Sequence, residues 1–192
     1  MEPKQVFHAY DGGAEPHSED ARYCLACGSA LSDRLDGDTV RRVCVACGFV
    51  RYRNPAPGVA VLVVDGERFV LCRRAPAAFE GGRWCLPCGY VEYHENYLAA
   101  AVREVEEETG LRVQIEAILS VTSNFLAPRV HTIVTILLAR PASGELRAGD
   151  DADLVRWFSV GEELPDLAFE ADRHIIERYF ATRLPGAPVQ PL

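Results

Sequence analysis

Basic charge is scarce in this sequence of 192 residues. Its 20 lysines and arginines face 28 aspartates and glutamates, so the formal net charge is −8 at pH 7. A broad nucleic-acid-binding surface needs clustered positive charge, and we therefore expect no nucleic-acid partner. A small anionic substrate is compatible with the acidic balance, because bound cations can invert the local field.

Long apolar runs and internal repeats are missing as well. No run reaches the roughly 20 residues of a membrane-spanning helix, and residues 1–8 lack the apolar core of a signal peptide. We therefore expect no membrane partner and, by default, a reducing cytoplasmic location. With 48% hydrophobic and 25% charged residues, the composition is that of a globular protein with room for one domain and a small module.

Four of the seven cysteines form two pairs with the spacing of a metal site. Cys24 and Cys27 are followed, after sixteen residues, by Cys44 and Cys47. Four thiolates at this spacing are typical of a structural Zn²⁺ centre that has no open coordination position. Disulfides or chance spacing are the alternatives. Residues 21–53 resemble a zinc ribbon, and so short a segment would depend on the metal because it cannot bury a sufficient apolar core.

The acidic stretch 96–110 carries the strongest functional signal. Apolar residues recur at helical spacing and Gly110 is a typical stop, so a helix is predicted. Glu104 and Glu108 lie four residues apart on one face, and Glu107 lies beside them, at the end of the helix where the dipole disfavours negative charge. A hard divalent cation, Mg²⁺ or Mn²⁺, would relieve this repulsion. The alternative is a solvated acidic helix end.

The stretch 89–111 resembles the Nudix box, Gly-x5-Glu-x7-Arg-Glu-U-x-Glu-Glu-x-Gly-U, in which U is a bulky aliphatic residue. Every defined position is filled, by Gly89, Glu95, Arg103, Glu104, Val105, Glu107, Glu108, Gly110 and Leu111. The resemblance implies an enzyme, a Nudix hydrolase that acts on acid anhydrides by cleaving nucleoside diphosphates linked to another moiety, X.

The resemblance also implies roles for individual residues of the box. Glu104, Glu107 and Glu108, together with the carbonyl of Gly89, are expected to hold the catalytic Mg²⁺ or Mn²⁺. Arg103 is expected to hydrogen-bond to the acidic cluster, and either Glu104 or Glu107 to act as the general base.

The fold implied by the resemblance is α/β, namely a Nudix α/β/α sandwich with a mixed sheet, preceded by the small zinc ribbon. We predict a flexible N-terminal extension at 1–20, the zinc ribbon at 21–53, the Nudix hydrolase domain at 57–184 and a tail at 185–192. Within the domain, strands are predicted at 58–64, 69–72, 111–122, 130–139 and 154–158, a loop at 123–129 and a helix at 168–184.

Residues outside the box are candidates for contacting the substrate. Arg73 and Arg74 end a strand that borders the substrate cleft in this family, so one of them could meet a phosphate; a solvated strand end is the alternative. Phe125, in the predicted loop, could stack on a base or instead cover the core. Asp151 or Asp153, just before the last predicted strand, could supply a further acidic ligand or base.

The sequence leaves X open. A zinc ribbon that leads through Tyr-Arg-Asn-Pro55 into a Nudix domain resembles the family branch that cleaves ADP-ribose, FAD or NADH. NADH-cleaving members carry Ser-Gln-Pro-Trp-Pro-Phe-Pro-x-Ser after the box, and region 120–129 lacks it. We therefore predict a pyrophosphatase for a small nucleotide such as ADP-ribose, FAD or a related dinucleotide.

Two alternatives to this function remain at the level of the sequence. One is a housecleaning nucleoside triphosphate pyrophosphohydrolase, and the other is a non-enzymatic regulator that senses nucleotides. We also predict a homodimer, in which the ribbon of one subunit docks on the neighbouring subunit.

Overall fold

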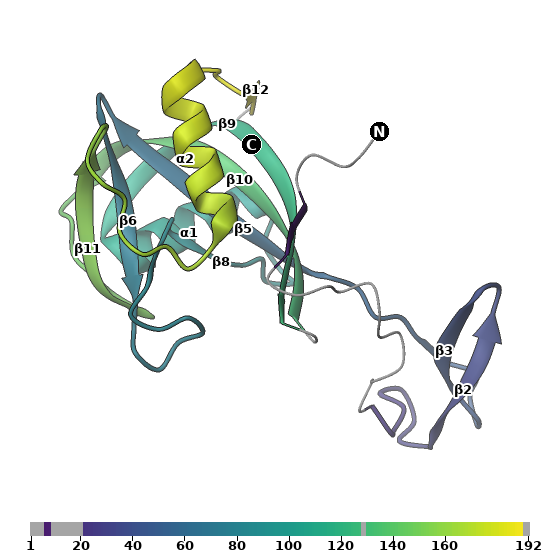
Figure 1. Cartoon of the computed structure of the whole chain (residues 1–192). Helices are drawn as coiled ribbons and strands as arrows, with labels where there is room; N and C mark the ends of the chain where they lie inside the picture. Colours follow the sequence, from purple (N-terminus) through teal and green to yellow (C-terminus); the bar gives the residue numbers. More distant parts are fainter. Residues whose placement is uncertain (1–5, 9–20, 128–129, 190–192) are drawn as a thin grey trace.

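The computed structural model describes residues 6–8, 21–127 and 130–189, and Figure 1 shows a small β-ribbon beside a larger body of sheet and helices. Of the predicted extension 1–20, Val6–His8 forms strand β1, which pairs in parallel with β9, and the other residues lie outside the described part. In the predicted tail, Ala187–Pro188 forms β12, which also pairs with β9. The domain boundaries themselves stay predictions.

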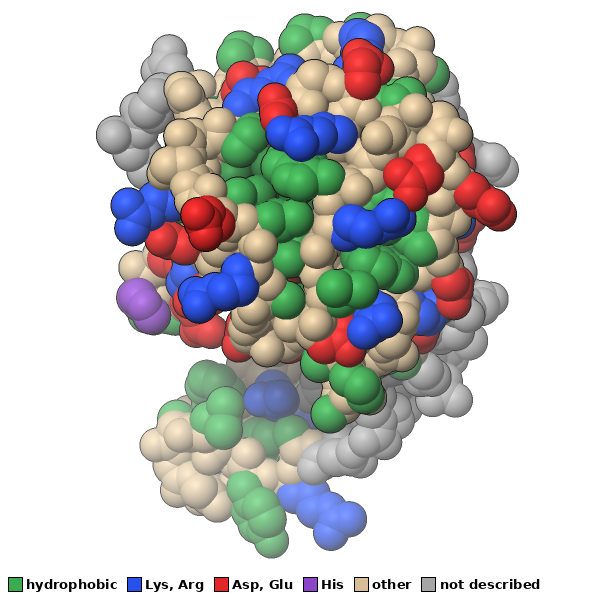
Figure 2. Space-filling view, turned by 90° about the vertical axis from the view of Figure 1, so that its left-hand side faces the viewer, with side chains coloured by type: hydrophobic (Ala, Val, Ile, Leu, Met, Phe, Trp, Pro, Cys, Tyr) green, Lys and Arg blue, Asp and Glu red, His purple; other side chains and the backbone are tan. Residues whose placement is uncertain are grey.

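The ribbon is built on a hairpin. Its strands are β2 (Leu31–Asp36), β3 (Thr39–Cys44) and β4 (Val50–Arg51), all antiparallel. Gly37 lies in the turn with a φ of 62°, a left-handed conformation that glycine adopts without steric cost. The buried core consists of Cys24, Leu31 and Cys44, and Figure 2 shows apolar side chains left on the surface of the ribbon. A core this small needs another source of stability.

The larger body contains a mixed sheet in the order β1-β9-β10-β5-β6-β11. Its long strands are β5 (Ala56–Asp65), β6 (Arg68–Arg74), β9 (Leu111–Ala127), β10 (Val130–Gly144) and β11 (Ala152–Ser159). The short strands β7 (Trp84–Cys85) and β8 (Cys88–Tyr90) pair with β6 and β5. The sheet is mixed, as predicted, because β10 runs parallel to β5 and antiparallel to β9.

Two helices cover the two faces of this sheet. They are α1 (Tyr97–Thr109) and α2 (Glu170–Thr182). Successive residues of a strand point to opposite faces. In β5, Val61 and Val63 belong to the same apolar cluster as Val105 of α1, whereas Leu62 belongs to the cluster that contains Ile176 of α2. The α/β/α sandwich is therefore confirmed, and β5 is buried on both sides.

Helix α1 begins and ends where its sequence signals predicted. The side-chain oxygen of Asn96 accepts hydrogen bonds from the backbone N–H groups of Leu98 and Ala99, both at 3.0 Å. At the other end, Gly110 has a φ of 71° and donates its N–H to the carbonyl of Glu106 at 2.9 Å. These caps hold the acidic C-terminal half of the helix in a defined register.

The predicted loop at 123–129 is wrong over most of its length. Residues 123–127 continue β9, and residues 128 and 129 lie outside the described part. Asn124 pairs with Thr132 and Phe125 with His131 on β10. This part of the strand was not predicted because its polar residues break the apolar alternation. It forms because it pairs with β10.

Charged side chains of both signs are interspersed on the face of the sandwich that Figure 2 shows. In the described part of the chain, no helix combines the length and the apolar character that crossing a membrane requires.

Candidate active site

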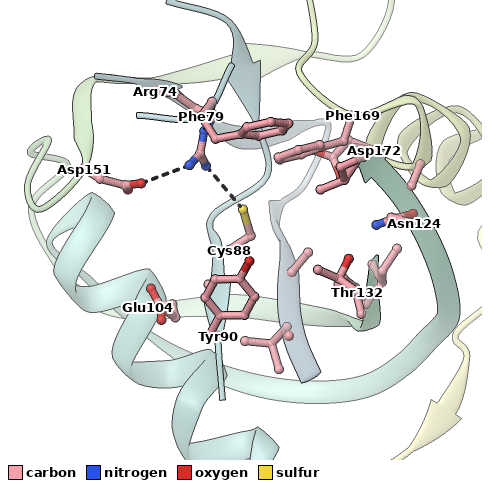
Figure 3. Close-up of a pocket in the computed structure, with 18 of the residues that line it drawn as sticks. Arg74, Phe79, Cys88, Tyr90, Glu104, Asn124, Thr132, Asp151, Phe169 and Asp172 are labelled. Carbon is pink, nitrogen blue, oxygen red and sulfur yellow. Dashed lines mark hydrogen bonds and ion pairs between the residues drawn. The ribbon is translucent and has the colours of Figure 1, made fainter. Parts of the chain in front are cut away.

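A cavity of about 500 Å³ opens on the α2 side of the sheet. Its floor is formed by alternate residues of three neighbouring strands, among them Ala60 of β5, Asn124 of β9 and Thr132 of β10. Phe79 from the loop after β6 and Phe169 from the start of α2 lie over this floor (Figure 3). The cavity therefore sits where β8, α1 and α2 converge on the sheet.

Three carboxylates meet at one end of the cavity. Oxygen atoms of Glu104, Glu107 and Asp150 all lie within 4.8 Å of one another. Glu104 is buried and lines the cavity, whereas Glu107 and Asp150 are exposed. Burial raises the pKa of Glu104, Arg103 opposes this, and the carboxylates of Glu107 and Asp150 add to the rise. The group offers only hard oxygen donors, which is the donor set that Mg²⁺ and Mn²⁺ prefer.

Arg103 joins this acidic group to the loop that precedes α1. One Nη donates to Glu104 at 2.8 Å and to Glu107 at 2.9 Å, as the sequence predicted. The other Nη and the Nε donate to the two carboxylate oxygens of Glu95 at 2.6 and 3.1 Å. Charge assistance makes such forked contacts strong and directional. Arg103 lowers the pKa of Glu95 to about 2, so this residue stays ionised as an anchor of the loop.

Gly89 on β8 is required by the position of Glu104. A Cβ atom at residue 89 would fall on the carboxylate of Glu104, whose side chain is buried and hydrogen-bonded. The missing side chain thus lets the acidic group approach the backbone of β8. The predicted role of the Gly89 carbonyl as a metal ligand stays a prediction.

Glu108 lies deeper than the other acidic residues of the box. It is 1% exposed, and its Oε2 accepts the backbone N–H of Cys88 at 3.0 Å. Burial raises its pKa well above the usual range, and the neighbouring Cys88 and Asp151 add to the rise. Asp150, which the sequence analysis had not singled out, takes the third place in the oxygen cluster. Metal ligation by Glu108 stays a prediction.

The two arginines at the end of β6 point in opposite directions, as neighbours on a strand do. Arg74 lines the cavity and donates to the carbonyl of Phe79 at 2.6 Å and to Asp151 at 3.1 Å (Figure 3). Arg73 instead forms a forked ion pair with Asp153 at 2.8 and 3.1 Å. Of the two candidates for a phosphate contact, the structure brings Arg74 to the cavity and turns Arg73 away from it.

Phe125 is not brought into the cavity. Its neighbours Asn124 and Leu126 line the cavity, and Phe125 is absent from the described residues that do so. Its ring stacks on His131 with 4.1 Å between the centroids. The prediction of Phe125 as a stacking platform assumed a loop, and the strand alternation of β9 removes its basis. Besides Asp150, sequence reasoning missed Asn124, Thr132 and Asp172, which line the cavity.

Asp172 is a buried acid at the roof of the cavity. It lies in the first turn of α2, is 3% exposed, and accepts the backbone N–H of Leu86 at 2.9 Å. Burial raises its pKa to about 7, against the opposing effects of that hydrogen bond and of Arg74. Asp172 therefore ties the segment between β7 and β8 to α2.

The four paired cysteines of the ribbon also converge, with all four sulfur atoms within 4.8 Å of one another. The Sγ of Cys47 lies 3.7 Å from that of Cys24 and 3.5 Å from that of Cys27, and Cys27 lies 3.5 Å from Cys44. Sulfur atoms at the corners of a tetrahedron with Zn–S bonds of about 2.3 Å would be about 3.8 Å apart. The donor set and its spacing fit a tetrahedral zinc ion.

Comparison with protein families identifies the family of the larger body. Residues 54–179, about two thirds of the chain, match the model of the NUDIX domain. The chain belongs to the Nudix hydrolase family. The Nudix box contributes Glu104 and Glu107 to the acidic end of the cavity. Arg103 of the box contacts both Glu95 and Glu104, and the carboxylate of Glu104 lies against Gly89.

Two named relatives illustrate the similarity of this chain to known proteins. The ADP-ribose pyrophosphatase of Methanocaldococcus jannaschii is 36% identical over 129 residues, which are 67% of this chain and 75% of that protein. The NAD-capped RNA hydrolase NudC of Pseudomonas aeruginosa is 33% identical over 174 residues, which are 88% of this chain. This chain spans 60% of the length of that NudC protein.

Among solved structures, a Nudix hydrolase from Nitrosomonas europaea superposes with a TM-score of 0.76 at 30% identity. The match covers 90% of this chain and 97% of the other chain. A bifunctional NMN adenylyltransferase/ADP ribose pyrophosphatase from Francisella tularensis shares the Nudix fold, with a TM-score of 0.54 at 23% identity over 68% of this chain and 42% of that one.

Proposed function

We propose that this Nudix hydrolase cleaves the pyrophosphate bond of a nucleoside diphosphate linked to X, of the ADP-ribose type, with Mg²⁺ or Mn²⁺. The observation that supports this most is the meeting of Glu104, Glu107 and Asp150 at the end of a cavity large enough for a nucleotide. The similarity to an ADP-ribose pyrophosphatase over three quarters of that relative supports the substrate class.

The residues present fit a divalent cation. Three carboxylates with one arginine partner leave an excess of negative charge, and the burial of Glu104 makes that excess costly. Glu104, Glu107 and Asp150 would hold the ion, with Glu108 and the Gly89 carbonyl as further ligands by family resemblance. A bound divalent ion would neutralise the charge of the pyrophosphate and lower the pKa of a water molecule.

The chain's own residues supply the positioning. Arg103 holds Glu104 and Glu107 together and locks them to Glu95, so both carboxylates are aligned before a substrate arrives. Of the two candidates for the general base, Glu104 is the one that lines the cavity. Arg74, fixed by Asp151 at the rim, is placed to attract the negatively charged diphosphate.

A hydrolysis screen with Mg²⁺ or Mn²⁺ tests the proposal. The substrates are ADP-ribose, FAD, NADH, diadenosine polyphosphates and nucleoside triphosphates, with release of nucleoside monophosphate or inorganic phosphate as the readout. We expect ADP-ribose or a related dinucleotide to be cleaved. Chelation of the metal should abolish this cleavage. Preference for a triphosphate would favour the housecleaning alternative. Binding of ADP-ribose with no cleavage under any metal would favour the sensing regulator.

A second candidate substrate is NADH or NAD-capped RNA, because the match to the NudC relatives extends over 88% of the chain. The ion pairs of the ribbon weigh against the RNA. In the ribbon, Arg41 is paired with Asp36 and Arg42 with Asp33, each at 3.0 Å, so part of its local basic charge is neutralised. Cleavage of NADH and of a capped oligonucleotide, compared with ADP-ribose at equal concentration, separates these substrates.

The zinc ion, the cytoplasmic location and the homodimer are likewise proposed. Metal analysis of the purified chain should find one tightly held zinc. Size-exclusion chromatography with light scattering would report the oligomeric state directly.

A further inference from the structure

Two side chains on the cavity floor each bury a polar atom that has no hydrogen-bond partner among the described residues. Asn124 is 7% exposed and Thr132 is 5% exposed, and the two residues lie opposite each other on β9 and β10. Neither the Oδ1 of Asn124 nor the Oγ1 of Thr132 has a hydrogen-bond partner among the described residues. A buried polar atom without a partner destabilises the folded state by about 1–3 kcal/mol. Because Asn124 and Thr132 also line the cavity, a molecule bound there can supply the missing hydrogen bonds.

The two side chains lie apart from the residues of the box. Figure 3 shows Asn124 and Thr132 on one side of the cavity, with Glu104 and Asp151 on the other. A molecule whose diphosphate lies against the acidic group would therefore extend its other end towards Asn124 and Thr132.

The walls between these two ends favour a flat, apolar ring. Leu126 and Val134 lie on the floor beside the polar pair, and Phe79 and Phe169 lie above it. Aromatic and aliphatic surfaces on both sides of a slot provide dispersion contacts to the faces of a ring, while a few polar groups read its edge. A sugar, which presents hydroxyl groups on every side, would leave many of them unpaired against this apolar lining.

We propose that Asn124 and Thr132, together with Asp172 at the roof, form the subsite that recognises the nucleobase of the substrate. The inference rests on the proposed function, because it places the diphosphate at the box. The amide of Asn124 offers a donor and an acceptor in one plane, which matches the edge of a base. The hydroxyl of Thr132 can donate or accept, so it completes the pattern. A ligand without a base would leave these site atoms unpaired, and this would make the subsite selective.

The decisive comparison is between two threonines. Thr132→Val removes the cavity hydroxyl with almost no change of shape. Thr122→Val is the matched control, because Thr122 is also buried on β9 with an unpartnered hydroxyl but does not line the cavity. Neither variant loses a hydrogen bond within the described structure, so both should be at least as stable as the wild type in urea unfolding. Asn124→Ala is the second test variant.

Binding is measured by calorimetry with Mg²⁺ present, using AMP, GMP and ribose 5-phosphate as probes. We expect at least one of the two nucleotides to bind more tightly than ribose 5-phosphate. Thr132→Val and Asn124→Ala should each weaken the binding of that nucleotide about fivefold or more, as the loss of one neutral hydrogen bond implies. Thr122→Val should leave its binding unchanged, and ribose 5-phosphate should bind equally to all four proteins.

The inference is overturned if ribose 5-phosphate binds as tightly as both nucleotides, or if Thr132→Val and Thr122→Val behave alike. Its failure is distinguishable from failure of the proposed function. If the protein binds AMP through Asn124 and Thr132 but cleaves no pyrophosphate, the base subsite is supported and the proposed enzymatic function is wrong. If the wild type and Thr132→Val cleave ADP-ribose with equal efficiency, the enzymatic function is supported and the subsite is wrong.

Discussion

Replacing Asp172 by asparagine should make the stability of the protein less sensitive to pH. Asp172 is buried, and its pKa is raised to about 7 from 3.8. Between these two values the folded chain keeps a proton that the unfolded chain has lost. The wild type therefore loses stability as the pH rises from about 4 to about 7, since ionising the buried acid favours unfolding. Asparagine stays neutral and retains a carbonyl that can accept the N–H of Leu86.

The size of the effect follows from the two pKa values. One pKa unit corresponds to 1.36 kcal/mol, so proton linkage between pH 5 and pH 8 gives a relative gain for Asp172→Asn of about 2.5 kcal/mol. The residue is 3% exposed, so solvent screening reduces this figure little. Arg74 opposes the rise in the pKa of Asp172. Both proteins contain Arg74, so the comparison needs no further variant.

The assay is urea unfolding of both proteins at pH 5, 6.5 and 8, with the free energy of unfolding extrapolated to water. The control is Asp166→Asn, because Asp166 is exposed and Arg83 lowers its pKa, so its difference from the wild type should be flat over this range. A free-energy difference for Asp172→Asn that is also independent of pH would refute the reasoning. An Asp172 that is ionised and paired would give this pH-independent difference, because its pKa would lie below the range of the assay.

Further perturbations address the box and the ribbon. Glu107→Gln should lower turnover with Mg²⁺ by at least about a hundredfold with an unchanged circular dichroism spectrum; near-wild-type rates would remove Glu107 from the metal site. Gly89→Ala should lower kcat about a hundredfold by displacing the carboxylate of Glu104, and unchanged kcat would show that this carboxylate can move without loss. Arg103→Lys, which cannot keep the forked contacts, should lower kcat more than it raises KM. Cys44→Ser should lose the zinc and the ordered ribbon while ADP-ribose cleavage persists; a full complement of zinc would contradict the assignment.

The Nudix box was readable from the sequence because its geometry is local. Residues three and four apart on a helix share a face whatever the rest of the chain does, so the grouping of Glu104 with Glu107 needed no tertiary information. The caps of α1 at Asn96 and Gly110 were readable for the same reason. The cysteine pairs of the ribbon are local too, and only the approach of one pair to the other required the hairpin that Gly37 turns.

The cavity floor could not be read in this way. Asn124 and Thr132 face each other because β9 and β10 pair over a long stretch, and polar residues in a sequence window look like a loop until that partner is known. Phe125 was a candidate for stacking on the substrate for the same reason, because its segment was predicted to be a loop. The choice between Arg73 and Arg74 depended on which face of β6 turns inward, and a pair of adjacent arginines carries no information about that.

The sequence alone determined the family, the acidic helix of the Nudix box and the four-cysteine ribbon, since each is encoded in short, fixed spacings of charged residues or cysteines. Tertiary structure alone decided that Asp150 joins the carboxylates, that Arg74 and not Arg73 lines the cavity, and that Asn124, Thr132 and Asp172 surround its far end. These residues come from segments far apart in the chain, and their approach depends on strand pairing and on the packing of α2 against the sheet. Such contacts are set by the whole fold and leave no periodic signal in the residues that make them.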